Sequence, residues 1–199
     1  MNINQTFELK KGNRQYNYFK CMQYLQQQGR ILYGSSYRIH PSQSQQLYRL
    51  LVYATANKEE CALYGINLQK GLLVTGPGNS GKTSLLHLLK PFFQTNRQYI
   101  IRSSREVAFC YERFGTHTVQ QYVSKDISYC FDDLGLEQFK LDTEVIKKLL
   151  QFRLLHAADN THISTRLNKA ALVEKYGKNF TELLYRKLNP IEFNNSFNL

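Results

Sequence analysis

Apolar residues in the first third of the chain recur at the three- and four-residue intervals that are typical of helices. Residues 15–28 predict a first helix, with Phe19, Met22 and Leu25 along one side. Gly29 follows directly, and glycine is a common residue at the end of a helix. We therefore expect this helix to end at Gly29.

Two further helices are expected before residue 67. Ser42 is a suitable N-cap for the first of them, because its hydroxyl can accept a hydrogen bond from a free backbone N–H. Its apolar face would comprise Leu47, Leu50, Leu51 and Ala54. Residues 58–64 predict the other, which is short. We expect residues 1–66 to form a small helical N-terminal module.

From residue 67 onward the pattern changes to short apolar runs that alternate with longer segments of helical spacing. Strands are expected at residues 72–74, 99–101, 129–131 and 162–164. Helices are expected at residues 83–93, 106–114, 144–158, 169–176 and 180–188. This alternation predicts an α/β domain over residues 67–199, in which helices cover both faces of a mainly parallel sheet.

Composition restricts the class of protein. The hydrophobic fraction of 42% is sufficient for a core, yet no apolar run approaches the roughly 20 residues that cross a bilayer. The N-terminus lacks the basic start and apolar stretch of a secretory signal. No two of the four cysteines have the C-x-x-C spacing, and the five histidines form no cluster. We expect a cytoplasmic protein with reduced cysteines and no metal site built from cysteine or histidine.

The charge indicates an anionic partner. Lys and Arg number 26 against 15 Asp and Glu, which gives a net charge of +11. Residues 1–57 contain seven of these cations, seven tyrosines and the single acid Glu8. The cations and rings could bind the phosphates and bases of single-stranded DNA. Alternatively, the tyrosines pack the helices while the charges are only solvated, or the helices dock on a partner protein.

The clearest motif is a phosphate-binding loop. Residues 76–83, GPGNSGKT, match G-x-x-x-x-G-K-[ST] at every fixed position. Three glycines, Gly76, Gly78 and Gly81, would let the backbone N–H groups converge on phosphate oxygens. A chance glycine turn is disfavoured because a strand precedes the motif and a helix follows it. The predicted nucleotide-binding residues are Gly76, Pro77, Gly78, Asn79, Ser80, Gly81, Lys82, Thr83 and Ser84.

A second acidic motif follows the strand at residues 129–131. Asp132 would hold Mg²⁺ together with the Thr83 hydroxyl, and Asp133 would orient or deprotonate the attacking water. Alone, two consecutive aspartates are more often a turn, but the upstream loop favours the functional interpretation. Lys82, which would reach the terminal phosphates, and Asp133 are the predicted catalytic residues; ATP and Mg²⁺ are the predicted cofactors.

From about Gly65 onward, the last two-thirds of the chain resembles the IstB/DnaC-like AAA+ ATPases, which include helicase loaders and helper proteins of DNA transposition. The matching blocks are residues 65–83, 131–135, 161–167, 174–177 and 189–193. The resemblance implies a P-loop NTPase fold of the AAA+ type. It also implies ATP bound between the subunits of a homo-oligomer, and work on DNA with a helicase or transposase.

Three departures from the family pattern favour nucleotide binding over fast hydrolysis. Arg166 stands where relatives have an asparagine that positions water, and Asn179 stands where they carry an arginine finger. Leu183 replaces another residue that is often basic in the family. Arg186, two helical turns after Asn179, could substitute for the finger or be a solvated charge. The third departure is length: the chain stops soon after Phe193, so no helical lid domain is expected.

Three functions remain open. The first is an ATPase that converts ATP and water to ADP and phosphate while assisting DNA replication or transposition. The second is a non-hydrolysing module for which ATP is only a conformational ligand. The third is a small-molecule phosphotransferase that shares only the P-loop. The sequence contains neither the base-reading motif of GTPases nor the signature of transporter ATPases.

Overall fold

The computed structural model describes residues 1–115, 117–137 and 140–194. Its centre is a parallel sheet with the strand order β4-β5-β6-β3-β7. These strands are β3 (Gly71–Thr75), β4 (Tyr99–Ser103), β5 (Ser128–Leu134), β6 (Thr161–Thr165) and β7 (Leu188–Glu192). Leu73 of β3 lies opposite Ile163 of β6 on one side and Pro190 of β7 on the other. The expected α/β fold with a parallel sheet is confirmed.

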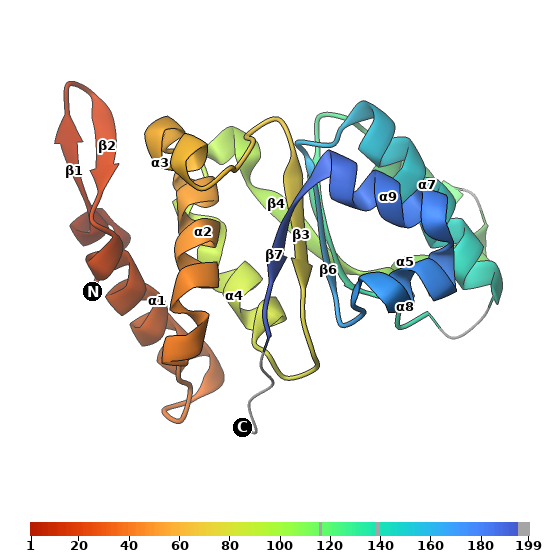
Figure 1. The fold of residues 1–199 in the computed structure, drawn as a ribbon, viewed down its shortest axis with the longest axis horizontal. Helices are drawn as coiled ribbons and strands as arrows, with labels where there is room; N and C mark the ends of the chain where they lie inside the picture. Colours follow the sequence, from red (N-terminus) through yellow and green to blue (C-terminus); the bar gives the residue numbers. More distant parts are fainter. Residues whose placement is uncertain (116, 138–139, 195–199) are drawn as a thin grey trace.

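Helices cover both faces of this sheet (Figure 1). One layer contains α1 (Tyr18–Tyr33), α2 (Ser44–Thr55), α3 (Lys58–Leu63) and α4 (Lys82–Leu89). The other contains α5 (Ser104–Phe114), α7 (Lys140–His156), α8 (Lys169–Tyr176) and α9 (Lys178–Lys187). A short helix, α6 (His117–Gln120), follows α5. Because β3 and β6 are buried on both faces, neither strand alternates between apolar and acidic or basic residues of the Asp, Glu, Lys or Arg type.

The N-terminal elements share one hydrophobic cluster with the sheet. Leu25 of α1 and Leu50 of α2 belong to the same buried cluster as Leu72 and Val74 of β3 and Leu86 of α4. The first layer of the domain is therefore built largely by residues that precede the phosphate loop. A division of the chain at residue 66 remains a prediction.

The start of the chain differs from the expectation. Residues 15–16 are not helical: a hairpin of β1 (Phe7–Lys10) and β2 (Asn13–Tyr16) precedes α1. The helix α1 begins only after Asn17, whose side chain accepts a hydrogen bond from the N–H of Lys20. Phe19, expected on its apolar side, is 72% exposed. The buried residues of α1 are instead Cys21, Tyr24, Leu25 and Gly29.

The expectation that α1 ends at Gly29 is also wrong. The helix continues to Tyr33 and ends at Gly34, whose φ is +101°. The aromatic ring of Tyr37 packs directly on Gly29: a Cβ at this position would lie 2.1 Å from a ring carbon. Glycine is therefore required here by the close approach of the ring and not by the backbone conformation.

Two smaller corrections concern a cap and a strand. Ser42 lies inside a 3₁₀ turn, Pro41–Gln43, which the side chain of His40 caps, and α2 begins at Ser44. The expected apolar residues of α2, which are Leu47, Leu50, Leu51 and Ala54, are all fully buried. The strand β7 is not among the expected strands, and it contains Pro190, which lacks an N–H. An edge strand tolerates this residue.

The remaining expected strands and helices are present, with ends that shift by up to four residues. Within the described residues, no helix combines the length and apolar character that a bilayer span requires.

Candidate nucleotide-binding site

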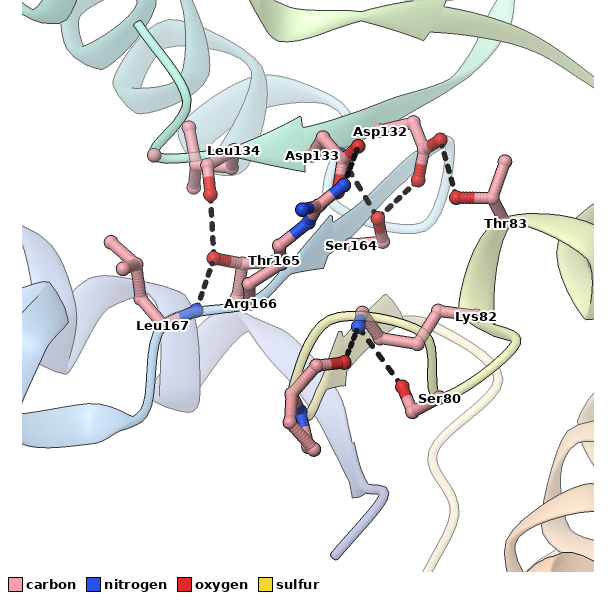
Figure 2. A network of polar contacts seen from close by, with 12 residues as sticks. Ser80, Lys82, Thr83, Asp132, Asp133, Leu134, Ser164, Thr165, Arg166 and Leu167 are labelled. Atoms are coloured by element: carbon pink, nitrogen blue, oxygen red, sulfur yellow. Dashed lines mark hydrogen bonds and ion pairs between the residues drawn. The ribbon is translucent and has the colours of Figure 1, made fainter. Parts of the chain in front are cut away.

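The phosphate loop, residues 76–81, leaves the carboxyl end of β3 and leads into α4 (Figure 2). Gly76 has φ +146°, and a Cβ there would lie 2.4 Å from the carbonyl oxygen of Phe193. Gly81 has φ +78° and precedes the first residue of α4. Both positions require glycine. Gly78 does not adopt a positive φ; Asn79, at +59°, takes the left-handed conformation instead.

Lys82 is the first residue of α4 and is 5% exposed. Its ammonium donates hydrogen bonds to the carbonyl oxygens of Gly76 (2.7 Å) and Pro77 (2.8 Å) and to the Ser80 hydroxyl (3.1 Å). Burial lowers the pKa of Lys82 to about 8, since desolvation disfavours the charged form. The cation predicted to contact terminal phosphates therefore lies inside the curve of the loop.

The two residues predicted to hold Mg²⁺ lie in contact, although 49 positions separate them. The Thr83 hydroxyl donates to Asp132 Oδ2 at 2.8 Å, and the Ser164 hydroxyl donates to the other carboxylate oxygen. Parallel strands end at the same edge of the sheet, which brings β5, β6 and the start of α4 together. A hydroxyl and a carboxylate are oxygen donors of the kind that Mg²⁺ prefers, so these residues fit the ion.

Asp133 is oriented separately from Asp132. Its φ of +56° is unusual for a residue other than glycine, and the pairing of β5 with β6 shifts between Phe131 and Leu134. The backbone N–H of Asp133 donates to the Ser164 hydroxyl at 3.0 Å. The irregular strand end turns the two neighbouring carboxylates in different directions, with Asp132 toward Thr83 and Asp133 toward Arg166 (Figure 2).

Arg166 pairs with Asp133 through both carboxylate oxygens. Its Nε lies 3.2 Å from Oδ1, and its Nη2 lies 3.2 Å from Oδ2. The Arg166 side chain is 47% exposed and that of Asp133 is 24% exposed, so water screens the pair in part. Sequence reasoning placed Arg166 near the reacting phosphate only through the resemblance, and it did not foresee this ion pair.

The loop that follows Asp133 is anchored by α8. Lys175 Nζ donates to the carbonyl oxygens of Gly135 (2.6 Å) and Glu137 (2.8 Å), and the buried Glu137 carboxylate accepts from the Tyr176 hydroxyl at 2.5 Å. Burial and the adjacent carboxylate raise the pKa of Tyr176, which stays protonated as a donor. These contacts give a structural role to the 174–177 block.

A cavity of about 650 Å³ extends from the phosphate loop toward the N-terminal third of the chain. Its far wall consists of Tyr33, Ser36, Tyr37, Arg38 and Gln43. The Gln43 side chain donates to the Ser80 carbonyl oxygen at 2.6 Å, and the hydroxyls of Tyr37 and Ser84 share a hydrogen bond of 3.4 Å. Sequence reasoning missed this wall, because no motif connects it with a loop some 40 residues away.

The positions discussed for an arginine finger, Asn179, Leu183 and Arg186, lie on α9, in the layer that covers the other face of the sheet. Leu183 is buried in that layer, whereas Asn179 and Arg186 are exposed. None of the described residues that line the cavity comes from α9. Whether Arg186 acts on a neighbouring subunit therefore remains a hypothesis.

Comparison with known proteins reveals similarity in fold. Neither a protein-family model nor a curated protein sequence matches this chain. The crystal structure of the DnaC helicase loader matches 80% of this chain and 94% of its own, with a TM-score of 0.63 and 19% identity. The DnaI structure matches 79% and 85%, with a TM-score of 0.57 and 19% identity.

A replication initiator, DnaA bound to AMPPCP and single-stranded DNA, matches 80% of this chain and 48% of its own, at a TM-score of 0.55 and 14% identity. At such identities the similarity establishes the fold. The chain has the P-loop fold of the AAA+ type, as the resemblance to the IstB/DnaC-like proteins predicted.

Proposed function

We propose that this protein binds Mg·ATP at the carboxyl edge of its sheet and uses it to assist a DNA-processing partner. The observation that carries the proposal is the contact of Thr83 with Asp132 beside a loop that curves around the Lys82 ammonium. The motif residues that would bind phosphate and metal thus meet at one place. The bound AMPPCP of a structural neighbour supports the choice of an adenine nucleotide.

Each part of the nucleotide has residues suited to it. The N–H groups of the phosphate loop and the Lys82 ammonium would bind the phosphates, and the positive end of α4 adds to this attraction. Thr83 and Asp132 would hold Mg²⁺, which supplies charge neutralisation on the phosphates. The cavity volume of about 650 Å³ suits a nucleotide-sized ligand, with the base lying against Tyr33 and Tyr37.

Measurement of ATP turnover with and without single-stranded DNA tests the proposed function. We expect hydrolysis that DNA stimulates, and Asp133→Asn should slow it while binding persists. Tight binding of ATP without turnover under either condition would favour the conformational-ligand function, which the Arg166–Asp133 pair and Asn179 motivate. Phosphate transfer to a metabolite, independent of DNA, would favour a phosphotransferase. Failure to bind any nucleotide would refute the site.

For the DNA partner, the structure offers a basic groove of about 1050 Å³ beneath the β1–β2 hairpin. The charged side chains that line it are Lys10, Arg14, Lys58 and Glu59, and the neutral polar ones include Asn4, Asn13, Gln15, Asn57, Gln94 and Gln98. Cations and amides of this kind bind a phosphate backbone without reading sequence. We propose this groove as a contact surface for single-stranded DNA.

Reversal of two charges in the groove tests this surface. The double variant Lys10→Glu/Lys58→Glu should bind single-stranded DNA more weakly. Two lost phosphate contacts should also reduce the slope of log K against log salt by about 1.4. Fluorescence anisotropy over a salt series measures both quantities. Lys148→Glu/Lys178→Glu changes the same net charge on exposed residues of α7 and α9. Equal losses in the two double variants would refute the groove as the contact surface.

A further inference from the structure

We propose that Arg166 is a reversible lock on Asp133: its guanidinium exchanges between this carboxylate and the terminal phosphate of ATP. Asp133 is then released to orient water only when a third phosphate is present. This inference rests on the proposed function and deepens it, because it makes one residue responsible for both nucleotide discrimination and control of the catalytic carboxylate.

The position of the guanidinium is the first observation. Arg166 uses Nε and Nη2 for Asp133, and its remaining nitrogen, Nη1, faces the phosphate loop, 3.6 Å from where a Cβ on Gly78 would lie. Arg166, Asp133 and Lys82 line the same cavity. The guanidinium therefore lies between the acid and the loop that would hold the phosphates (Figure 2).

The second observation is that the Arg166–Asp133 pair is weak enough to exchange. Both side chains are partly exposed, and exposed ion pairs contribute little to stability. A terminal phosphate carries more negative charge than a carboxylate and also accepts the fork of an arginine through two oxygens. ADP lacks this phosphate, so its binding would leave the pair intact.

Third, the position of Asp133 is fixed without Arg166. The backbone of Asp133 is held by its N–H bond to the Ser164 hydroxyl, and Ser164 is itself bonded to Asp132. Release of the guanidinium would therefore free the carboxylate without moving the strand end. Lys82 would exchange partners in the same way as Arg166. Its ammonium donates to loop carbonyl oxygens, which phosphate oxygens would replace when ATP binds.

The affinities of ATP and ADP, measured by isothermal titration with Mg²⁺, test the lock. The full protein is compared with Arg166→Gln, Asp133→Asn and the double variant. Arg166→Gln should weaken ATP about tenfold and ADP less than about twofold, because only ATP has the phosphate that Arg166 would contact. Arg113→Gln, at an exposed position in the last turn of α5, is the matched control.

The double variant isolates the lock from general electrostatics. Loss of the Asp133 charge removes a repulsion on any triphosphate, so Asp133→Asn strengthens ATP binding somewhat even when it is combined with Arg166→Gln. If Asp133 competes for Arg166, the gain should be about two- to fivefold larger when Arg166 is present. A purely structural role of Arg166 would not produce this excess, nor a loss specific to ATP.

Two results overturn the inference. Equal effects of Asp133→Asn with Arg166 present and in the Arg166→Gln variant would show that the carboxylate does not restrain the guanidinium. Equal losses of ATP and ADP in Arg166→Gln would show that Arg166 does not contact the third phosphate. Either result leaves the proposed function standing if the unaltered protein binds Mg·ATP, whereas absence of all nucleotide binding would refute the proposed function itself.

Discussion

Replacement of Lys82 by alanine should weaken ATP binding by about 2–5 kcal/mol, or roughly 30- to 5,000-fold. The variant would lose the ammonium that donates to the carbonyl oxygens of Gly76 and Pro77 and to the Ser80 hydroxyl. The terminal phosphates would then remain buried against the loop without their cation. Titration calorimetry or a fluorescent ATP analogue measures the loss, and turnover should fall with it.

The charge state of Lys82 gives a second measure of the same effect. Burial lowers its pKa to about 8, and contact with phosphates would raise it again, so binding takes up a proton. The affinity of the unaltered protein should therefore decline as the pH rises above 8, by up to about tenfold per unit.

The control for Lys82→Ala is Lys90→Ala, which removes a lysine just beyond α4. If both alanine variants bind ATP equally well, Lys82 is not the phosphate ligand.

Replacement of Arg153 by methionine should cost about 3–5 kcal/mol of unfolding free energy. Arg153 lies on α7 and is fully buried. Its five N–H groups donate to Tyr122 O, Ser124 O, Ile127 O, Asn160 O and the Thr161 hydroxyl. Methionine fills a similar volume but leaves these buried oxygens without donors. Thermal unfolding should shift down by roughly 6–20 °C.

Arg105→Met, on the exposed side of α5, separates this effect from the loss of one positive charge. Arg153→Lys should lie between the two, since an ammonium has at most three donors for five acceptors. The acceptors belong to the segment that precedes β5 and to the start of β6, two neighbouring strands of the central sheet, so circular dichroism should report loss of the whole fold. Equal melting temperatures for the two methionine variants would contradict the assigned role.

The features that the sequence predicted well are those set by local pattern. The apolar run of β3, residues 72–74, has no polar alternation, which indicates a strand buried on both faces. The loop motif specifies its own backbone, and parallel strands place their carboxyl ends together. The contact of Thr83 with Asp132 was therefore predictable although 49 positions separate the two residues.

The features that the sequence did not predict depend on contacts between distant segments. In the sequence, Gly29 indicates the end of a helix. In the structure, the ring of Tyr37 occupies the space that a side chain at this position would need. Gln43 approaches Ser80 because α2 packs on α4, and no local pattern encodes that contact. The Arg166–Asp133 pair likewise depends on the irregular end of β5, where Asp133 takes a left-handed conformation.

The close approach of Phe193 to Gly76 affects when, during synthesis of the chain, the nucleotide-binding site is complete. Phe193 donates its N–H to Thr75 O, and its own carbonyl oxygen occupies the space beside Gly76. A ribosome synthesises the loop more than a hundred residues before this support emerges. Because a domain completes its packing as a unit, a nascent chain would gain affinity for nucleotide only after Phe193 has emerged.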